Sequence, residues 1–186
     1  MANVLSICGS IRARSYNRAL MQTLPKIAPT GMRIVESPRI DVIAHYNHDI
    51  QEMKGFPAEV TALADAIRAA DGVIIVSPEY NWTIPGTLKN AIDWVSRMKD
   101  QPFKDKPVAI QSASIALLGG SRMQYHLRQC LTSVDAFVFG RPEVIVTHAQ
   151  QKFDEKTLEL KDQPTLDIIK QQLELFAKFI ERVKAK

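Results

Sequence analysis

The chain has 186 residues, 46% of them hydrophobic and 24% charged, which is typical of one globular domain spanning residues 1–186. No apolar stretch approaches the ~20 residues of a membrane helix, and the N-terminus lacks secretory-signal features, so we expect a cytoplasmic protein without a membrane partner. The net charge of +4 comes without the basic and aromatic cluster of a nucleic-acid site, and two cysteines in apolar contexts argue against a disulfide framework.

Apolar runs alternate with amphipathic segments along the whole chain. Strands are expected at 4–8, 32–36, 72–77 and 108–112, and a fifth across 136–139 and 144–147, interrupted near 140–142. Helices are expected at 17–26, 57–70, 85–99, from 121 to about 133, and at 164–184. Residues 37–56 and 148–163 are expected to be irregular.

Alternation of buried-type strands with helices predicts an α/β fold. Five strands favour a flavodoxin-like, doubly wound parallel sheet in the order 2-1-3-4-5, with helices on both faces. In such sheets ligands bind beyond the carboxyl ends of the strands, so the loops after strands one, three and four are the candidate site.

The loop after the first strand is rich in side chains that bind phosphate. They are Ser10, Arg12, Arg14, Ser15, Asn17 and Arg18. The same loop enters a helix, whose free N–H groups and dipole attract anions. It matches neither the dinucleotide fingerprint nor the Walker motif, so the sequence predicts an anion site of another kind.

A second interpretation of this loop is a cysteine-dependent, low-molecular-weight phosphatase. Cys8, Arg14 and Ser15 fit the spacing Cys-x5-Arg-Ser. A thiolate among arginines at a helix N-terminus would be nucleophilic. Against this reading, Cys8 continues an apolar strand and no convincing aspartate acid is found elsewhere.

The loop after the third strand carries Pro78, Glu79, Tyr80 and Asn81, and Pro85 suits the first turn of the next helix. Its backbone groups and flat side chains suit a planar ligand with a polar edge, such as a flavin. We expect Trp94, further along this helix, to pack in the core. After the fourth strand, Ser112, Ser114 and the pair Gly119-Gly120 offer small residues for close approach to a ligand.

The histidines form no spacing typical of a metal site. His45, His48 and Asp49 lie close together, but a polar loop explains them, and no metal is expected.

The first two loops together resemble the NAD(P)H-dependent FMN reductase family, within its quinone- and chromate-reductase branch. The family motif G-S-x-R-x-x-S-x-N is matched by Gly9, Ser10, Arg12, Ser15 and Asn17. The motif P-E-Y-N-x-x-x-P-G-x-L-K-N-A-I-D-W is matched from Pro78 to Trp94. The resemblance covers most of the chain and weakens over residues 148–163.

The resemblance implies a bound FMN. Its implied phosphate ligands are Ser10, Arg12, Ser15, Asn17 and Arg18. Its implied ring contacts are Pro78, Glu79, Tyr80 and Asn81, with Ser112, Ser114, Gly119 and Gly120 opposite. Ala116 stands where the family usually has glycine, and its methyl group is expected to shift the third loop slightly.

The resemblance also implies a reductase that passes electrons from NADH or NADPH, by a ping-pong mechanism, to quinones and similar acceptors, including chromate or azo compounds. Arg97 is a candidate for attracting an anionic acceptor or a cofactor phosphate. Arg122, Tyr125 and Glu143 match positions of inter-subunit contacts in relatives, which form homodimers or homotetramers. An FMN-binding electron carrier without NAD(P)H turnover remains the alternative within this fold.

Overall fold

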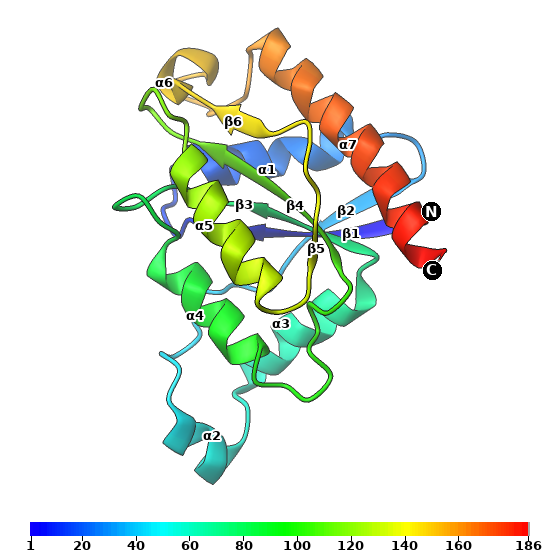
Figure 1. Ribbon diagram of the computed structural model, residues 1–186. Helices are drawn as coiled ribbons and strands as arrows, with labels where there is room; N and C mark the ends of the chain where they lie inside the picture. The colour runs from blue at the N-terminus through cyan, green and yellow to red at the C-terminus, as the bar shows by residue number, and fades with distance from the viewer. Residues whose placement is uncertain (186) are drawn as a thin grey trace.

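The computed structural model describes residues 1–185 and is organised around one parallel β-sheet. The six strands run in the order β2-β1-β3-β4-β5, with β6 also paired to β4 (Figure 1). They are β1 (Ala2–Cys8), β2 (Met32–Glu36), β3 (Gly72–Val76), β4 (Pro107–Ala113), β5 (Phe137–Val138) and β6 (Val144–Val146). The predicted order 2-1-3-4-5 is therefore confirmed, with two short strands sharing the fifth position.

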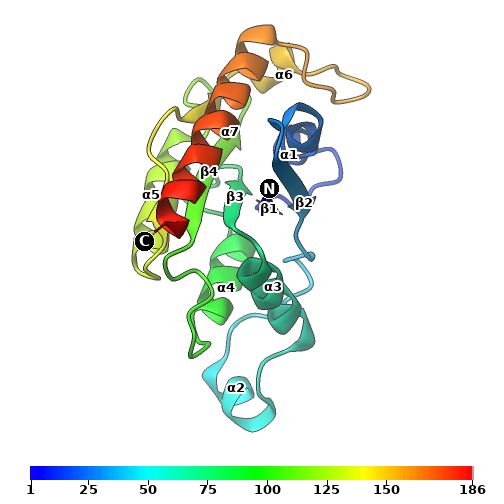
Figure 2. The ribbon, with the colours of Figure 1, turned by 90° about the vertical axis from the view of Figure 1, so that its right-hand side faces the viewer.

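Helices cover both faces of this sheet (Figure 2). They are α1 (Tyr16–Ile27), α2 (His48–Lys54), α3 (Ala58–Ala69), α4 (Gly86–Val95), α5 (Ser121–Thr132), α6 (Ala149–Lys152) and α7 (Gln163–Lys184). One hydrophobic core lies between the sheet and α3, α4 and α5, and a second between the sheet and α1 and α7. The strands feed both cores alternately, because successive side chains point to opposite faces of a sheet.

Three predicted segments differ from the structure: two segments expected to be irregular contain a helix, and one helix is shorter than expected. Residues 37–56 include α2, and residues 148–163 include the short helix α6. Helix α2 buries none of its residues, so it lacks the apolar stripe that would reveal it in the sequence. Helix α4 ends at Val95 rather than at residue 99.

The connection that leads to α2 is anchored on α4. The Trp94 indole N–H donates to the Ala44 carbonyl at 2.8 Å, and the Asn90 side chain accepts from the Tyr46 N–H at 2.8 Å. The Trp94 side chain is fully buried, which confirms its predicted role in packing. The second motif therefore serves two purposes, because its last residues hold the 43–46 segment while its first residues face the carboxyl edge of the sheet.

Candidate functional site

The loops after β1, β3 and β4 meet around one cavity of about 290 Å³ at the carboxyl edge of the sheet. Its lining residues are Ser10, Arg12, Ser15, Tyr16, Asn17, Pro78, Glu79, Tyr80, Ala113, Ser114 and Ile115. Eight of the thirteen residues expected to contact a cofactor are among them. The structure thus brings together three segments that are far apart in the chain.

The first loop presents positive charge at the N-terminus of α1. Ser15 caps the helix, since its hydroxyl accepts from the Arg18 N–H at 3.3 Å, and no acidic residue lies in the first turn. Ser10 is buried and its hydroxyl accepts from the Arg12 N–H at 3.4 Å. The Arg12 guanidinium donates to the Arg14 carbonyl at 2.9 Å and has no ion-pair partner within residues 1–185. Phosphate groups are commonly bound by N–H groups at a helix N-terminus, by hydroxyls and by arginine, and this loop offers all three.

Asn17 lines the cavity, and its side-chain amide also bonds to the backbone of β4. Its side-chain oxygen accepts from the Ala113 N–H at 2.9 Å, and its amide nitrogen donates to the Ala113 carbonyl at 2.8 Å. The residue is 3% exposed. Asn17 therefore ties the first loop to the end of β4 rather than presenting a free amide to a ligand.

Arg18 lies outside the lining of the cavity. Its guanidinium pairs with Glu36 at 2.8 Å. The pairing draws its charge toward β2 and away from the N-terminus of α1.

The geometry does not support a cysteine phosphatase. Cys8 is buried, its thiol donates to the Ser10 carbonyl at 3.4 Å, and burial raises the pKa of this thiol. Arg14 donates to the carbonyls of Glu155 and Lys156 instead of facing the sulfur. A protonated, buried thiol without its arginine is not an activated nucleophile.

The second loop is a tight turn with a strained backbone. Tyr80 and Thr83 exchange reciprocal backbone hydrogen bonds of 3.0 Å, and the two residues between them, Asn81 and Trp82, have φ angles of 49° and 68°. A left-handed conformation is unusual for tryptophan, so contacts elsewhere must hold it. The turn leaves Pro78, Glu79 and Tyr80 on the cavity wall, whereas Asn81 lies outside the lining.

The third loop contributes fewer residues than expected. Ser114 lines the cavity, but Ser112 is fully buried inside β4, where its hydroxyl accepts from the Gln124 side chain at 2.8 Å. Gly119 and Gly120 also lie away from the lining. A Cβ at Gly119 would come within 2.6 Å of the Ile145 side chain, so these glycines serve close packing at the start of α5.

The alanine that replaces the usual glycine fits without strain. Ala116 is exposed, and it is not among the residues with positive φ. Its N–H donates to the Ser114 hydroxyl at 3.1 Å. The backbone conformation at Ala116 is therefore one that alanine adopts as readily as glycine, and it gives no reason for the expected shift of the third loop.

Arg97 lies far from the cavity. It follows the C-terminus of α4, whereas the second loop enters the N-terminus of this helix, about 15 Å away at ~1.5 Å per residue. Its guanidinium lies 5.6 Å from the centre of the Tyr46 ring and borders a separate cavity of about 190 Å³. The structure therefore does not bring Arg97 together with the loops that line the cavity.

The three expected inter-subunit residues lie on or near α5. Arg122 stacks over the Trp82 ring at 4.2 Å, and Glu143 pairs with Arg128 at 3.3 Å, so both have partners within the chain. Tyr125 is 59% exposed.

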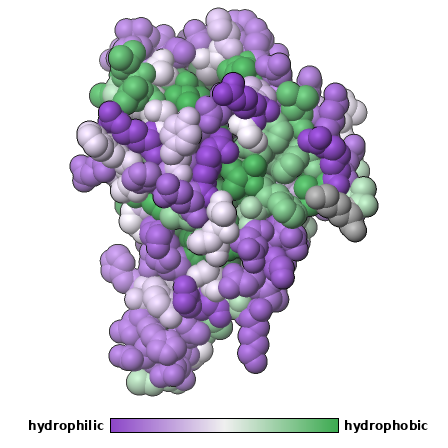
Figure 3. Space-filling model, in the orientation of Figure 1, coloured by the Kyte–Doolittle hydropathy of each residue, from purple (hydrophilic) through white to green (hydrophobic). Residues whose placement is uncertain are grey.

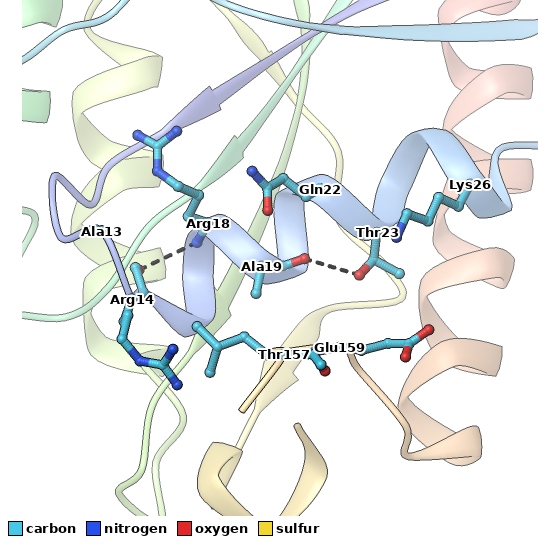
Figure 4. A pocket seen from close by; sticks show the side chains of 11 residues that line it. Ala13, Arg14, Arg18, Ala19, Gln22, Thr23, Lys26, Thr157 and Glu159 are labelled. Carbon is cyan, nitrogen blue, oxygen red and sulfur yellow. Dashed lines mark hydrogen bonds between the residues drawn. The ribbon is translucent and has the colours of Figure 1, made fainter. Parts of the chain in front are cut away.

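Another hollow, of about 450 Å³, runs beside α1 (Figure 4). It lies between the helix and residues 157–159, and it shares Ser15 with the cavity at the sheet edge. No aromatic side chain lines it, and its charges are mixed, with Arg14 and Lys26 against Glu159. It therefore lacks the flat wall that a ring ligand needs.

Residues 1–185 contain neither a membrane-spanning helix nor a cluster of metal-ligating side chains. None of their helices combines the length and hydropathy needed to cross a bilayer. Within the same residues, no three His, Cys, Asp or Glu side chains are grouped so that they could hold a metal ion.

Comparison with known proteins places this geometry in a family. Residues 2–151 match the family model described as NADPH-dependent FMN reductase. The chain is 51% identical over 181 residues to a quinone reductase from Escherichia coli (strain K12), covering 97% of this chain and 96% of that protein. It is 42% identical over 181 residues to an NAD(P)H-dependent FMN reductase from Pseudomonas aeruginosa, with the same coverage.

The solved structures give a consistent result. A flavoenzyme NAD(P)H:acceptor oxidoreductase from Paracoccus denitrificans superposes with a TM-score of 0.87 at 30% identity, covering 98% of each chain. The matched family model spans both loops that carry the two sequence motifs. The chain therefore belongs to the NADPH-dependent FMN reductase family.

Proposed function

We propose that this protein is an oxidoreductase that binds FMN between its three loops and passes electrons from NADPH or NADH to quinones. The observation that carries the proposal is the convergence of a phosphate-type loop and a ring-type loop on one cavity. Bound FMN supplies the chemistry, since it takes a hydride from a nicotinamide and later gives electrons to an acceptor. The names of the relatives, quinone reductase and FMN reductase, support this activity.

The chain's own residues bind and orient the cofactor. Ser10, Arg12 and the Ser15-capped end of α1 hold the phosphate, because they combine donors with unpaired positive charge. The backbone of Pro78 to Tyr80 and that of Ser114 face each other across the cavity and hold the ring. Tyr80 is 45% exposed and forms the outer wall, next to which a flat acceptor enters.

Steady-state and single-turnover measurements test this function. FMN-loaded protein should lose its flavin absorbance when NADPH or NADH is added without oxygen, and benzoquinone should restore it. Protein that binds FMN but is not bleached by either nicotinamide would be an electron carrier. Protein that cannot be loaded with FMN would contradict the proposal altogether. Chromate and an azo dye, used in place of benzoquinone, test the wider acceptor range that we infer for this cytoplasmic enzyme.

We also infer that copies of this chain associate through the rim of the cavity. Ile115, Leu117 and Leu118 at the tip of the third loop are 61%, 71% and 41% exposed. Figure 3 shows hydrophobic side chains at the surface on the upper left of this view, the side on which Figure 1 draws the connection between β4 and α5. Trp82 on the second loop is 64% exposed. Monomeric proteins rarely expose such a group of large apolar side chains, which favours a homodimer or homotetramer.

Analytical ultracentrifugation tests this association. Wild-type protein should sediment as a dimer or tetramer, and Leu117→Ser should shift it toward monomer, because a polar group at this tip opposes apolar burial. Val42→Ser, at a 54% exposed site outside the second and third loops, is the matched control and should leave the assembly unchanged. A wild-type monomer at micromolar concentration would contradict the inference.

A further inference from the structure

Helix α5 begins without a cap of its own. Its N-cap residue is Gly120, which has a φ of 92° and no side chain to accept from the first turn. A Cβ at this position would lie 2.8 Å from the Ser112 Cβ, so the usual capping residues Ser, Asp and Asn do not fit here. The Ser121 N–H donates to the Leu118 carbonyl at 2.9 Å, whereas the Met123 N–H receives no acceptor from the N-cap residue.

Glu79 of the second loop supplies this cap from 44 residues away. Its carboxylate oxygen Oε2 accepts from the Met123 N–H at 3.1 Å, the same N3 position that a local cap would serve. The other oxygen, Oε1, lies 3.9 Å from the Arg122 guanidinium, and the Glu79 side chain is only 14% exposed. A negative charge at the N-terminus of a helix is also favoured by the helix dipole.

Two further contacts join the same pair of segments. The Arg122 guanidinium stacks over the Trp82 ring at 4.2 Å, and His126 Nδ1 lies 2.9 Å from the Thr83 hydroxyl oxygen. The first two turns of α5 therefore contact the turn at 79–83 at three residues, Glu79, Trp82 and Thr83. These contacts explain how Trp82 keeps its left-handed conformation.

From this geometry we propose that Glu79 is a positioning residue that fixes the distance between the two walls of the flavin-ring cavity, rather than a direct ligand of the ring. The inference rests on the proposed binding of FMN. Pro78 and Tyr80 on one wall belong to the loop that Glu79 anchors, and Ser114 on the other wall leads into α5. The carboxylate accepts from the helix end and lies near the Arg122 guanidinium, so its negative charge is partly compensated by α5.

Three substitutions separate positioning from direct binding. Glu79→Gln keeps the length and one acceptor for the Met123 N–H, so flavin affinity should fall by less than about fivefold. Glu79→Asp keeps the charge but withdraws the acceptor by about 1.5 Å. Glu79→Asp and Glu79→Ala should each weaken binding by about tenfold or more, and they should alter the visible spectrum and fluorescence of the bound flavin.

Riboflavin and FMN should lose affinity by the same factor in Glu79→Ala, because the walls contact the ring that both share. Asp162→Ala is the matched control, since Asp162 caps α7 through the Thr165 N–H, away from the cavity. It should lower thermal stability while leaving flavin affinity and spectrum unchanged.

The order of the variants decides the inference. A higher flavin affinity in Glu79→Gln than in Glu79→Asp supports the positioning role. A higher affinity in Glu79→Asp than in Glu79→Gln would show that the charge itself binds the ligand, and it would overturn the inference. Unchanged flavin binding and spectrum in Glu79→Ala would also overturn it. A failure of the proposed function looks different, because wild-type protein would then bind neither riboflavin nor FMN.

Discussion

Asn17→Leu is expected to lower the free energy of unfolding of the FMN-free protein by about 2–5 kcal/mol. The substitution keeps the number and branching of the side-chain heavy atoms but leaves the buried N–H and C=O of Ala113 without partners, and each such group costs about 1–3 kcal/mol. A loss of this size is a large part of the ~5–15 kcal/mol that stabilises a typical domain. Urea unfolding followed by circular dichroism measures it.

Thr23→Val provides the matched control on the same helix. The Thr23 hydroxyl donates to the Ala19 carbonyl within α1, so no backbone group outside the helix loses a partner. Its effect should stay within about 0.5 kcal/mol. Equal stability of Asn17→Leu and wild type would show that the bridge between α1 and β4 contributes nothing. Riboflavin binding should weaken in Asn17→Leu as well, because Ala113 and Ser114 form the cavity wall that the bridge holds.

The sheet could be predicted from the sequence because its signal is local. Each central strand is a short apolar run bounded by turn residues, and helix–strand alternation then leaves few possible strand orders. Helix α2 was not predicted because its sequence carries no such local apolar pattern. None of its residues is buried, and its start depends on Asn47, whose side chain accepts from the Asp49 N–H at 2.9 Å.

The contacts that the site residues make within the chain went beyond the sequence analysis for two physical reasons. Some roles depend on partners distant in the chain, such as Asn17 with Ala113 and Glu79 with Met123, and a single sequence does not record such pairs. Other placements could have been foreseen from simple geometry. Ser112 lies inside β4, which continues to Ala113, so alternation along the strand directs its side chain toward α5.

The same geometry applies to Arg97. Any residue three turns along the helix that starts at Gly86 lies about 15 Å from the loop that precedes this helix. The two motifs were sufficient to locate the cavity. They did not reveal which of their residues face the cavity and which of them hold its loops in place.

Arg12→Ala is expected to weaken FMN binding by about 1.5–3 kcal/mol, which is roughly a tenfold to 150-fold rise in the dissociation constant. Arg12 lines the cavity beside the N-terminus of α1, and no carboxylate in the described part of the chain neutralises its guanidinium. A charge-assisted hydrogen bond to phosphate would be lost in the variant. Fluorescence titration of the FMN-free protein measures the change.

Riboflavin separates the phosphate contribution from that of the ring. Because riboflavin carries no phosphate, Arg12→Ala should bind it as wild type does, whereas Glu79→Ala should bind it more weakly. Arg12→Gln removes the charge while keeping a polar side chain with an N–H donor in the loop, and it should lose FMN affinity nearly as much as the alanine variant.

Arg14→Ala is the matched control for charge. Its guanidinium donates to the carbonyls of Glu155 and Lys156, outside the lining of the cavity, so FMN affinity should change by less than about threefold. The difference in FMN affinity between Arg12→Ala and wild type should also become smaller at high salt, since screening weakens the attraction between Arg12 and the phosphate. Equal losses of riboflavin and FMN affinity in Arg12→Ala would contradict the assignment of this arginine to the phosphate. They would show instead that it acts by ordering the whole first loop.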